Sequence, residues 1–520
     1  MIDIMKFIKV LILIVSLVTC TPSMVFAQPK PKRDISKDRI LAEKQADIER
    51  KAISRSRIHK KKQGSATKSN QRNMSSHSHQ SGSKTKEQKY YADSQRKIEV
   101  IEEQSDMLAQ DEAQVQSGLS FYYGEGEVQD YKQATILFKK AAELGNSEAQ
   151  CYLGLCYYDG TGVPQDYQQA VYWLKKGAEQ GNAEAQSHLG LCYFKGAGVV
   201  QDYHQAVYWF TKAAEQGDDI AQNYLGLFYY QGQGVAQNYQ QAVHWFTKAA
   251  EQGDGDAQSV LGICYYQGQG VAQDYYQAVY WFRKASEQGD MNAQCILGMC
   301  YLLGQGIAQD YQQAVHWFTK AAEQGSMTAQ TNLGFCYYTG QGVLPNHQQA
   351  AYWYKKAAEQ GDADAQACLG FFYYEGYGVM KDFQQATYWY TKAAERGVDV
   401  AQANLGVCYY NGQGVSKDYK QAVYWLKQAA EQGHVGGQAW LGACYFQGTG
   451  VSKDHKQAVY WFKLAAEQGE MSAQSNLGYC YYYGKGISKD HTLGIYWLKK
   501  AAAQGFAQAR DILSQIGIKL

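Results

Sequence analysis

The stretch CYYDGTG, at residues 156–162, ends in a Gly-x-Gly pair, a spacing that can turn backbone N–H groups toward a phosphate. The same pair recurs eleven times at intervals of 36 residues, from Gly124 and Gly126 to Gly484 and Gly486. A phosphate site needs one such loop, whereas eleven at equal spacing indicate a structural turn. We therefore interpret the glycine pair as a hinge between two elements of a repeat.

Acidic residues and histidines are the other side chains here that could do acid–base or metal chemistry. An Asp or Asn recurs once in each 36-residue unit, and Asp166 with Gln169 has the spacing of a helix capping box. Eight of the eleven histidines lie in the periodic part, several of them at positions that hold tyrosine in sister units. No HExxH, CxxC or Gly-x-Ser-x-Gly motif occurs. We expect no catalytic, cofactor-binding or metal-binding residues, and therefore a protein that is not an enzyme.

Two helices in each unit position these residues. The segment AQCYLGLCYYDG (149–160) places Leu153 and Cys156 on one face at helical spacing, and Gly160 is suited to end the helix in a left-handed cap. The segment YQQAVYWLKKGAEQG (167–181) has the same period and begins directly after the predicted cap. The sequence therefore predicts a repeated pair of antiparallel helices.

A glycine also lies in the middle of the first helix of every unit, as at Gly154. Each such glycine costs roughly 1 kcal/mol relative to alanine, so close packing of a neighbouring helix must offset it. We expect the ring of Trp173, and of the tryptophan in the equivalent position of later units, to fill the space next to this glycine.

The string A-x-x-x-L-G-x-x-Y-x-x-G-x-G-V-x-x-D-x-x-x-A-x-x-W-x-x-x-A-A-E-Q-G, read from residues 185–217, resembles the Sel1-like repeat, a relative of the tetratricopeptide repeat. The resemblance covers residues 113–508. It implies an all-α fold, a superhelical α-solenoid of about eleven 36-residue antiparallel helix pairs with a concave groove. It also implies a role in scaffolding protein complexes, including exported ones. Residues 98–112 are expected to add a lead-in helix and residues 509–520 a capping helix.

Residues 1–27 have the pattern of a secretory signal peptide, with Lys6 and Lys9 before an apolar stretch and a cleavage site after Ala27. An uncleaved membrane anchor is less well supported because the apolar stretch is short for a bilayer span. Lipid attachment at Cys20 is also the weaker interpretation. We expect export to the periplasm or to the extracellular medium.

Residues 28–97 carry 20 Lys or Arg against 7 Asp or Glu and show no sustained apolar period. This composition predicts a disordered basic linker. Two interpretations of it remain open, a solvated tether or a contact to acidic surfaces or anionic lipid, and we expect no specific nucleic-acid partner.

Cysteines recur in the first helix of the units, and the second helix offers alanine where a partner would be needed. Some exported members of the resembled family link the two helices by a disulfide and have been described as binding β-lactam-type ligands. We predict that the cysteines of this chain are instead reduced, buried thiols.

The face of the first helix that lies opposite the shared apolar stripe changes from unit to unit, as expected of a surface that recognises a partner. For the middle residue of this face in each unit, core packing between repeats is an equally supported interpretation. The leading hypothesis is a non-enzymatic scaffold or adaptor that binds a protein or peptide in the groove, in envelope assembly or host interaction. The alternative is a binder of glycans, muropeptides or β-lactam-type small molecules. The candidate groove residues are Tyr152, Asp159, His188, Lys195, Tyr224, Gln231, Gln267, Ile296, Leu303, Asn332, Glu375, Asn404, Asn411, Trp440, Asn476 and Tyr483.

Overall fold

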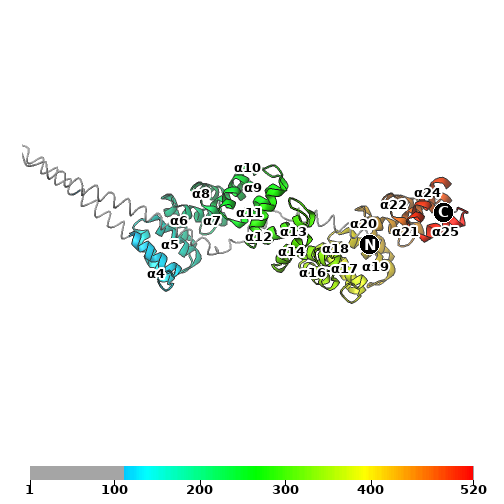
Figure 1. Cartoon of the computed structure of the whole chain (residues 1–520), viewed down its shortest axis with the longest axis horizontal. Helices are drawn as coiled ribbons and strands as arrows, with labels where there is room; N and C mark the ends of the chain where they lie inside the picture. The colour runs from blue at the N-terminus through cyan, green and yellow to red at the C-terminus, as the bar shows by residue number, and fades with distance from the viewer. Residues whose placement is uncertain (1–95, 97–110, 519–520) are drawn as a thin grey trace, which may run out of the picture. The chain divides into compact units, whose positions relative to one another are not determined.

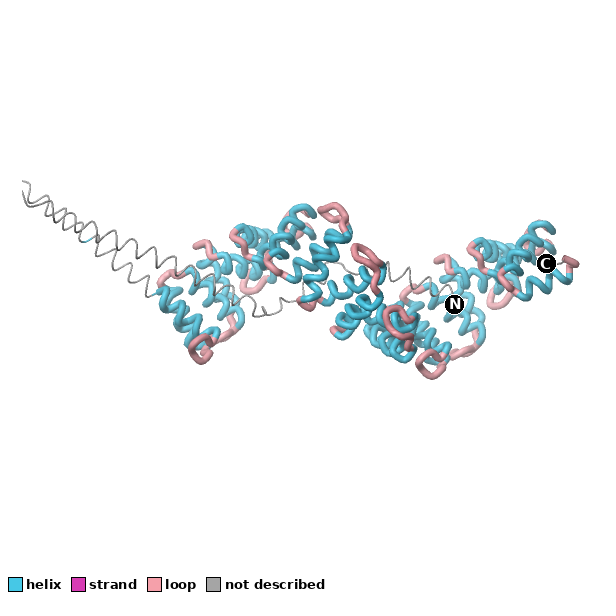
Figure 2. The backbone as a smooth tube through the Cα atoms, viewed as in Figure 1, coloured by secondary structure: helices cyan, strands magenta, loops and turns pink. Residues whose placement is uncertain are grey.

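The computed structural model describes residue 96 and residues 111–518, which form α-helices joined by short loops, with no strand among them (Figures 1 and 2). The predicted signal peptide (1–27), the basic linker (28–97, apart from residue 96) and nearly all of the predicted lead-in helix (98–112) lie outside the described residues. The chain divides into two compact units, with the boundary between Asn238 and Tyr239.

The first unit begins with a helix at residues 111–123. It continues with α4 (Tyr131–Glu143), α5 (Ser147–Asp159), α6 (Tyr167–Glu179), α7 (Ala183–Lys195), α8 (Tyr203–Glu215) and α9 (Asp219–Gln231).

The second unit contains α10 (Tyr239–Glu251), α11 (Gly255–Gln267), α12 (Tyr275–Glu287), α13 (Met291–Leu303), α14 (Tyr311–Glu323), α15 (Met327–Thr339), α16 (His347–Gln360), α17 (Ala363–Glu375), α18 (Phe383–Glu395), α19 (Asp399–Asn411), α20 (Tyr419–Glu431), α21 (Val435–Gln447), α22 (His455–Glu467), α23 (Met471–Tyr483), α24 (His491–Ala503) and α25 (Ala507–Gln515).

Each repeat holds one A helix followed by one B helix. The A helices are residues 111–123 and the odd-numbered helices from α5 to α23, and the B helices are the even-numbered ones. Repeat 1 therefore ends with α4, repeat 2 is α5 and α6, and repeat 11 is α23 and α24. Within each unit every helix packs against the next one along the chain. The predicted all-α solenoid of about eleven helix pairs is confirmed.

The loop between the A and B helices explains the Gly-x-Gly pair. Gly160 ends α5 with a left-handed backbone (φ 74°), and the carboxylate of Asp166 accepts the N–H groups of Gln168 and Gln169 at 2.9 and 3.0 Å. Both predicted caps are confirmed. The second glycine has another role, because a Cβ on Gly162 would collide with the backbone carbonyl of Tyr131 in the preceding B helix. The loop of one repeat thus rests on the backbone of the repeat before it.

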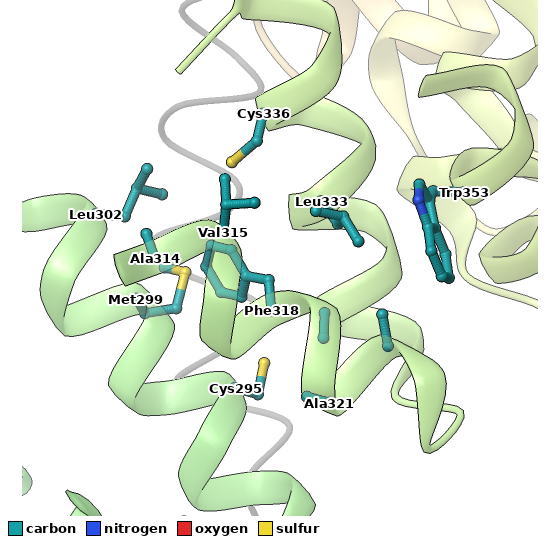
Figure 3. Packing of buried hydrophobic residues seen from close by; sticks show 12 residues of the cluster. Cys295, Met299, Leu302, Ala314, Val315, Phe318, Ala321, Leu333, Cys336 and Trp353 are labelled. Atoms are coloured by element: carbon teal, nitrogen blue, oxygen red, sulfur yellow. The ribbon is translucent and has the colours of Figure 1, made fainter. Parts of the chain in front are cut away.

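The prediction that the tryptophan fills the space beside the mid-helix glycine is wrong by one residue. A Cβ on Gly334 would lie 3.0 Å from the ring of Tyr354, so this ring, and not that of Trp353, covers the glycine. Trp353 is buried and packs in a cluster that contains Phe318 of α14 and Leu333 of α15 (Figure 3). Adjacent aromatic residues of a B helix therefore point to different interfaces: one closes its own repeat and the other joins it to the preceding repeat.

The eleven cysteines of residues 111–518 are buried thiols, as predicted. Burial alone raises the pKa of the Cys264 thiol from 9.0 to about 12. These thiols act as small apolar groups of the core. In the described part of the chain, no helix combines the length and the apolar character needed to cross a membrane.

Candidate functional site

A row of buried glutamines holds the A helices in place. In α13, the side-chain N–H of Gln294 donates to the carbonyl of Ser286 at 3.1 Å, and its Oε1 accepts from Nε2 of Gln324 at 2.8 Å. Gln294 therefore joins the end of the preceding B helix to the end of the next one. The same glutamine pair forms at Gln150–Gln180, Gln186–Gln216, Gln258–Gln288, Gln330–Gln360, Gln402–Gln432, Gln438–Gln468 and Gln474–Gln504. We call these bonds the glutamine ladder.

The glutamine ladder is interrupted at two junctions of the described residues. In repeat 1, Leu144 replaces the closing glutamine, and the buried Oε1 of Gln114 has no hydrogen-bond partner among those residues. The second interruption lies at Arg396, inside the array.

Arg396 stands where most of its sister units have glutamine, and its guanidinium donates to the carbonyl of Gly361. Gln366 still donates to the carbonyl of Ala358 at 3.1 Å, but its buried Oε1 has no hydrogen-bond partner among the described residues. A buried acceptor without a partner is destabilising, so the junction of α16, α17 and α18 is weaker than the junctions that have a complete glutamine pair.

All sixteen predicted groove residues lie on A helices, but their exposure differs. Tyr152 and Asn332 are buried. Partly buried are His188, Tyr224, Gln231, Ile296, Leu303, Asn404 and Asn476, and exposed are Asp159, Lys195, Gln267, Glu375, Asn411, Trp440 and Tyr483. We refer to the fourteen accessible residues as the A-helix face.

Tyr152 and Asn332 must be reassigned from the predicted surface to the core. The ring of Tyr152 stacks on Phe138 of α4 with centroids 5.2 Å apart, and its burial raises the pKa of its hydroxyl well above the usual value. The amide of Asn332 contacts the sulfur of Met299 in the preceding A helix at 3.4 Å. Both side chains therefore pack between repeats, as the sequence suggests for the middle residue of the same face.

The structure brings candidate residues together in neighbouring repeats and not as one set. A helices of successive repeats touch, as α5 does α7 and α21 does α23. Burial raises the pKa of Asp159 in α5, and the charge of Lys195 in α7 opposes that shift. Lys195 also reaches the hydroxyl of Tyr158 at 3.4 Å. Opposite charges on consecutive A helices thus partly compensate each other.

Repeats 10 and 11 hold the two largest exposed side chains of the A-helix face, and their ring contacts extend into repeat 9. Trp440 of α21 is 37% exposed and meets Tyr410 of α19 edge to face, with centroids 5.2 Å apart. The hydroxyl of Tyr410 donates to Oε1 of Gln447 at 3.2 Å. In α23, Tyr483 is 42% exposed and lies 4.6 Å from the ring of Tyr479. Tyr410, Gln447 and Tyr479 are not among the sixteen predicted groove residues.

Residues 111–518 contain no group of three or more His, Cys, Asp or Glu side chains placed to hold a metal ion. The side chains of the A-helix face include aromatic rings, amides and single charges, which are groups that proteins use in recognition.

Comparison with known proteins agrees with this architecture. The Sel1 repeat family profile matches eleven segments, at residues 111–146, 147–182, 183–218, 219–254, 255–290, 292–326, 328–362, 363–398, 399–434, 436–470 and 472–506. A search of curated proteins found no match.

Two solved structures are informative neighbours. The crystal structure of c5321, described as a protective antigen of uropathogenic Escherichia coli strains with an SLR fold, is 40% identical with a TM-score of 0.73, over 79% of this chain and 90% of that one. A Sel1 repeat protein from Oxalobacter formigenes is 33% identical, over 59% of this chain and 89% of that one, with a TM-score of 0.46. Since eleven family repeats account for most of the chain and its helices, the chain belongs to the Sel1 repeat family.

Proposed function

We propose that this chain is an exported scaffold that binds a protein partner through the A-helix face, with repeats 9 to 11 as the principal contact. Sel1 repeat proteins are generally protein-interaction scaffolds and are typically non-catalytic. The proposal adds a location for the contact and a cellular compartment to that general role.

The exposure of Trp440 is the observation that carries the proposal. The repeated tryptophans of the B helices are buried or partly buried, for example Trp173 at 8% exposed, whereas Trp440 presents more than a third of its surface to solvent. Exposed tryptophan and tyrosine are the residues that most often dominate the energy of a protein interface. The neighbouring Asn404 and Asn476 supply amides that can pair with the backbone of an extended segment.

The test compares Trp440→Ala with Tyr424→Ala in the full chain. Tyr424 lies on B helix α20 and is 53% exposed, so its removal deletes a similar aromatic surface away from the A-helix face. We expect a protein captured from an envelope extract to be lost with Trp440→Ala and retained with Tyr424→Ala. Equal retention by both variants, or binding to a glycan and muropeptide array with no protein captured, would contradict the proposal.

Export is tested separately. The support is the sequence pattern of residues 1–27, which lies outside the described structure. We expect fractionation to recover the protein from the periplasm or the medium with an N-terminus at Gln28. Recovery of an intact N-terminus from the cytoplasm would refute export while leaving the binding surface untouched.

A further inference from the structure

The loops that join A to B helices, taken with the first residues of the B helix, change their charge along the chain. In repeats 2 to 6, residues 160–169 and their equivalents contain no lysine or arginine and, apart from repeat 4, one aspartate each. In repeats 9 to 11, residues 412–421, 448–457 and 484–493 contain three aspartates and six lysines. These are Lys417, Lys420, Lys453, Lys456, Lys485 and Lys489, which we call the lysine row. These loops are thus acidic in the early repeats and basic in the late ones.

The lysines do not take over the structural role of the residues they replace. In repeat 2, Gln165 donates to the carbonyl of Tyr158 at 2.8 Å and closes the end of the A helix. Lys417 occupies the equivalent position in repeat 9, and its ammonium group lies 5.7 Å from the ring centre of Tyr419 instead. All six lysines of the lysine row are exposed. At Lys417, Lys453 and Lys489, which occupy the position of Gln165, the substitution of glutamine by lysine therefore gives up a helix-end hydrogen bond and adds an exposed charge.

The aspartates of these loops are already engaged. Asp418 accepts the backbone N–H groups of Lys420 and Gln421 at 2.8 and 3.0 Å, and Asp454 accepts those of Lys456 and Gln457 at 2.8 and 3.1 Å. Within residues 111–518, no salt bridge joins a lysine of the row to a carboxylate. The ammonium groups are consequently available to a partner.

The lysine row is connected to the aromatic part of the A-helix face. Trp440 meets Tyr410, and Tyr410 meets Tyr419 edge to face with centroids 5.2 Å apart. Tyr419 in turn carries the ammonium group of Lys417 beside its ring. An occupant that covers Trp440 would therefore reach the first lysine of the row across two rings.

We propose that the lysine row binds an acidic segment of the partner protein while Trp440 receives an apolar side chain from the same segment. This inference rests on the proposed function, whose contact it describes in chemical terms. The basic segment 28–97 of this chain is not the occupant, because it has the same sign of charge as the row. Charge complementarity with an apolar anchor is the arrangement that gives both a fast encounter and a specific register.

The experiment measures binding of a labelled peptide rich in glutamate with one leucine, and of its glutamine counterpart, to the full chain by fluorescence anisotropy. The test variant changes Lys417, Lys420, Lys453 and Lys456 to glutamine. The control variant makes the same change in charge at four exposed B-helix lysines, Lys175, Lys176, Lys212 and Lys248. We expect the test variant to weaken binding of the acidic peptide at least tenfold and to flatten its dependence on salt, and the control variant to change neither.

Equal weakening by both variants would show a nonspecific effect of net charge and would overturn the inference. Anionic vesicles or a polyanionic polysaccharide that bind with the same lysine dependence, when the acidic peptide does not bind, would also overturn it. A captured protein partner that is lost with Trp440→Ala but binds the four-lysine variant at unchanged affinity would refute acid recognition and leave the proposed function standing. Circular dichroism of both lysine variants verifies that the helices are retained.

Discussion

Arg396→Gln should stabilise the protein, although it removes a charged residue that makes a hydrogen bond. A glutamine at this position is expected to donate to Oε1 of Gln366, as the other ladder glutamines do at 2.8 to 3.0 Å. It would also reach the carbonyl of Gly361, as Gln432 reaches that of Gly397 at 3.0 Å. The change therefore completes the glutamine ladder at this junction.

The magnitude follows from two opposing terms. A buried acceptor left without a partner costs about 1–3 kcal/mol, which the new hydrogen bond recovers. The variant loses the attraction between exposed Arg396 and the carboxylate of Asp362. Burial raises the pKa of that carboxyl, and the N–H of Ala365 and the charge of Arg396 oppose the shift. Exposed ion pairs contribute about 0–1 kcal/mol. The net gain in the free energy of unfolding is about 1–2 kcal/mol, because the recovered hydrogen bond to Gln366 outweighs the lost attraction of Arg396.

Native-state hydrogen exchange is the suitable assay, because long repeat arrays need not unfold in one step. Amides of α17 and α18 should exchange about 5–30-fold more slowly in Arg396→Gln, since each 1.4 kcal/mol is about a factor of ten. The matched control is Gln432→Arg, which interrupts the ladder at the next junction and should accelerate exchange in α19 and α20. Unchanged or faster exchange in Arg396→Gln would refute the role assigned to the ladder.

Three further predictions concern the core and its titratable groups. Gly298→Ala places a Cβ 2.7 Å from two ring atoms of Phe318 and should lower the free energy of unfolding by about 1–3 kcal/mol in urea titrations, whereas Gly255→Ala, whose nearest contact is 3.4 Å, should be neutral or slightly stabilising. Burial raises the pKa of Cys264 from 9.0 to about 12, so the folded state keeps a proton that the unfolded state loses between these pH values. The free energy of unfolding should therefore fall as pH rises through that range. Iodoacetamide at about pH 8 should label the buried thiols only after denaturation, and labelling of the native protein would contradict this. Burial, with the charges of Asp362 and Asp399, raises the pKa of Asp364 from 3.8 to about 7, so the free energy of unfolding should decline as pH rises across that range. Urea midpoints measured against pH should lose this decline in Asp364→Asn.

The helices and their ends could be predicted because local chemistry determines them. The period of the apolar residues, the Asp166 cap and the left-handed Gly160 all act within a few residues of the chain. The partner of the mid-helix glycine was misplaced because neighbouring positions on a helix differ by only about 100° in direction, and either can face a given neighbour.

Contacts between repeats could not be obtained in the same way. The glutamine ladder joins side chains 30 residues apart, and a glutamine in the sequence resembles a surface residue until its partner is known. Its signal was the Gln that recurs at the same position of every A helix, and the Gln that precedes the closing glycine in every unit except those closed by Leu144 and Arg396. Tyr152 and Asn332 were assigned to the surface for a related reason, because the neighbouring repeat covers a strip of the A helix that a single helical period does not reveal.

The glutamine ladder also has a consequence for how such a chain can lengthen. Each rung recurs at the same two positions of the unit 36 residues later, so a duplication or deletion of 36 residues leaves the remaining glutamine pairs intact. An insertion inside a helix would instead turn its glutamine to another face and leave buried amide groups without partners. Recombination can therefore lengthen or shorten the array by whole repeats without breaking the ladder. The repeat closed by Arg396 would introduce the same interruption wherever it was duplicated.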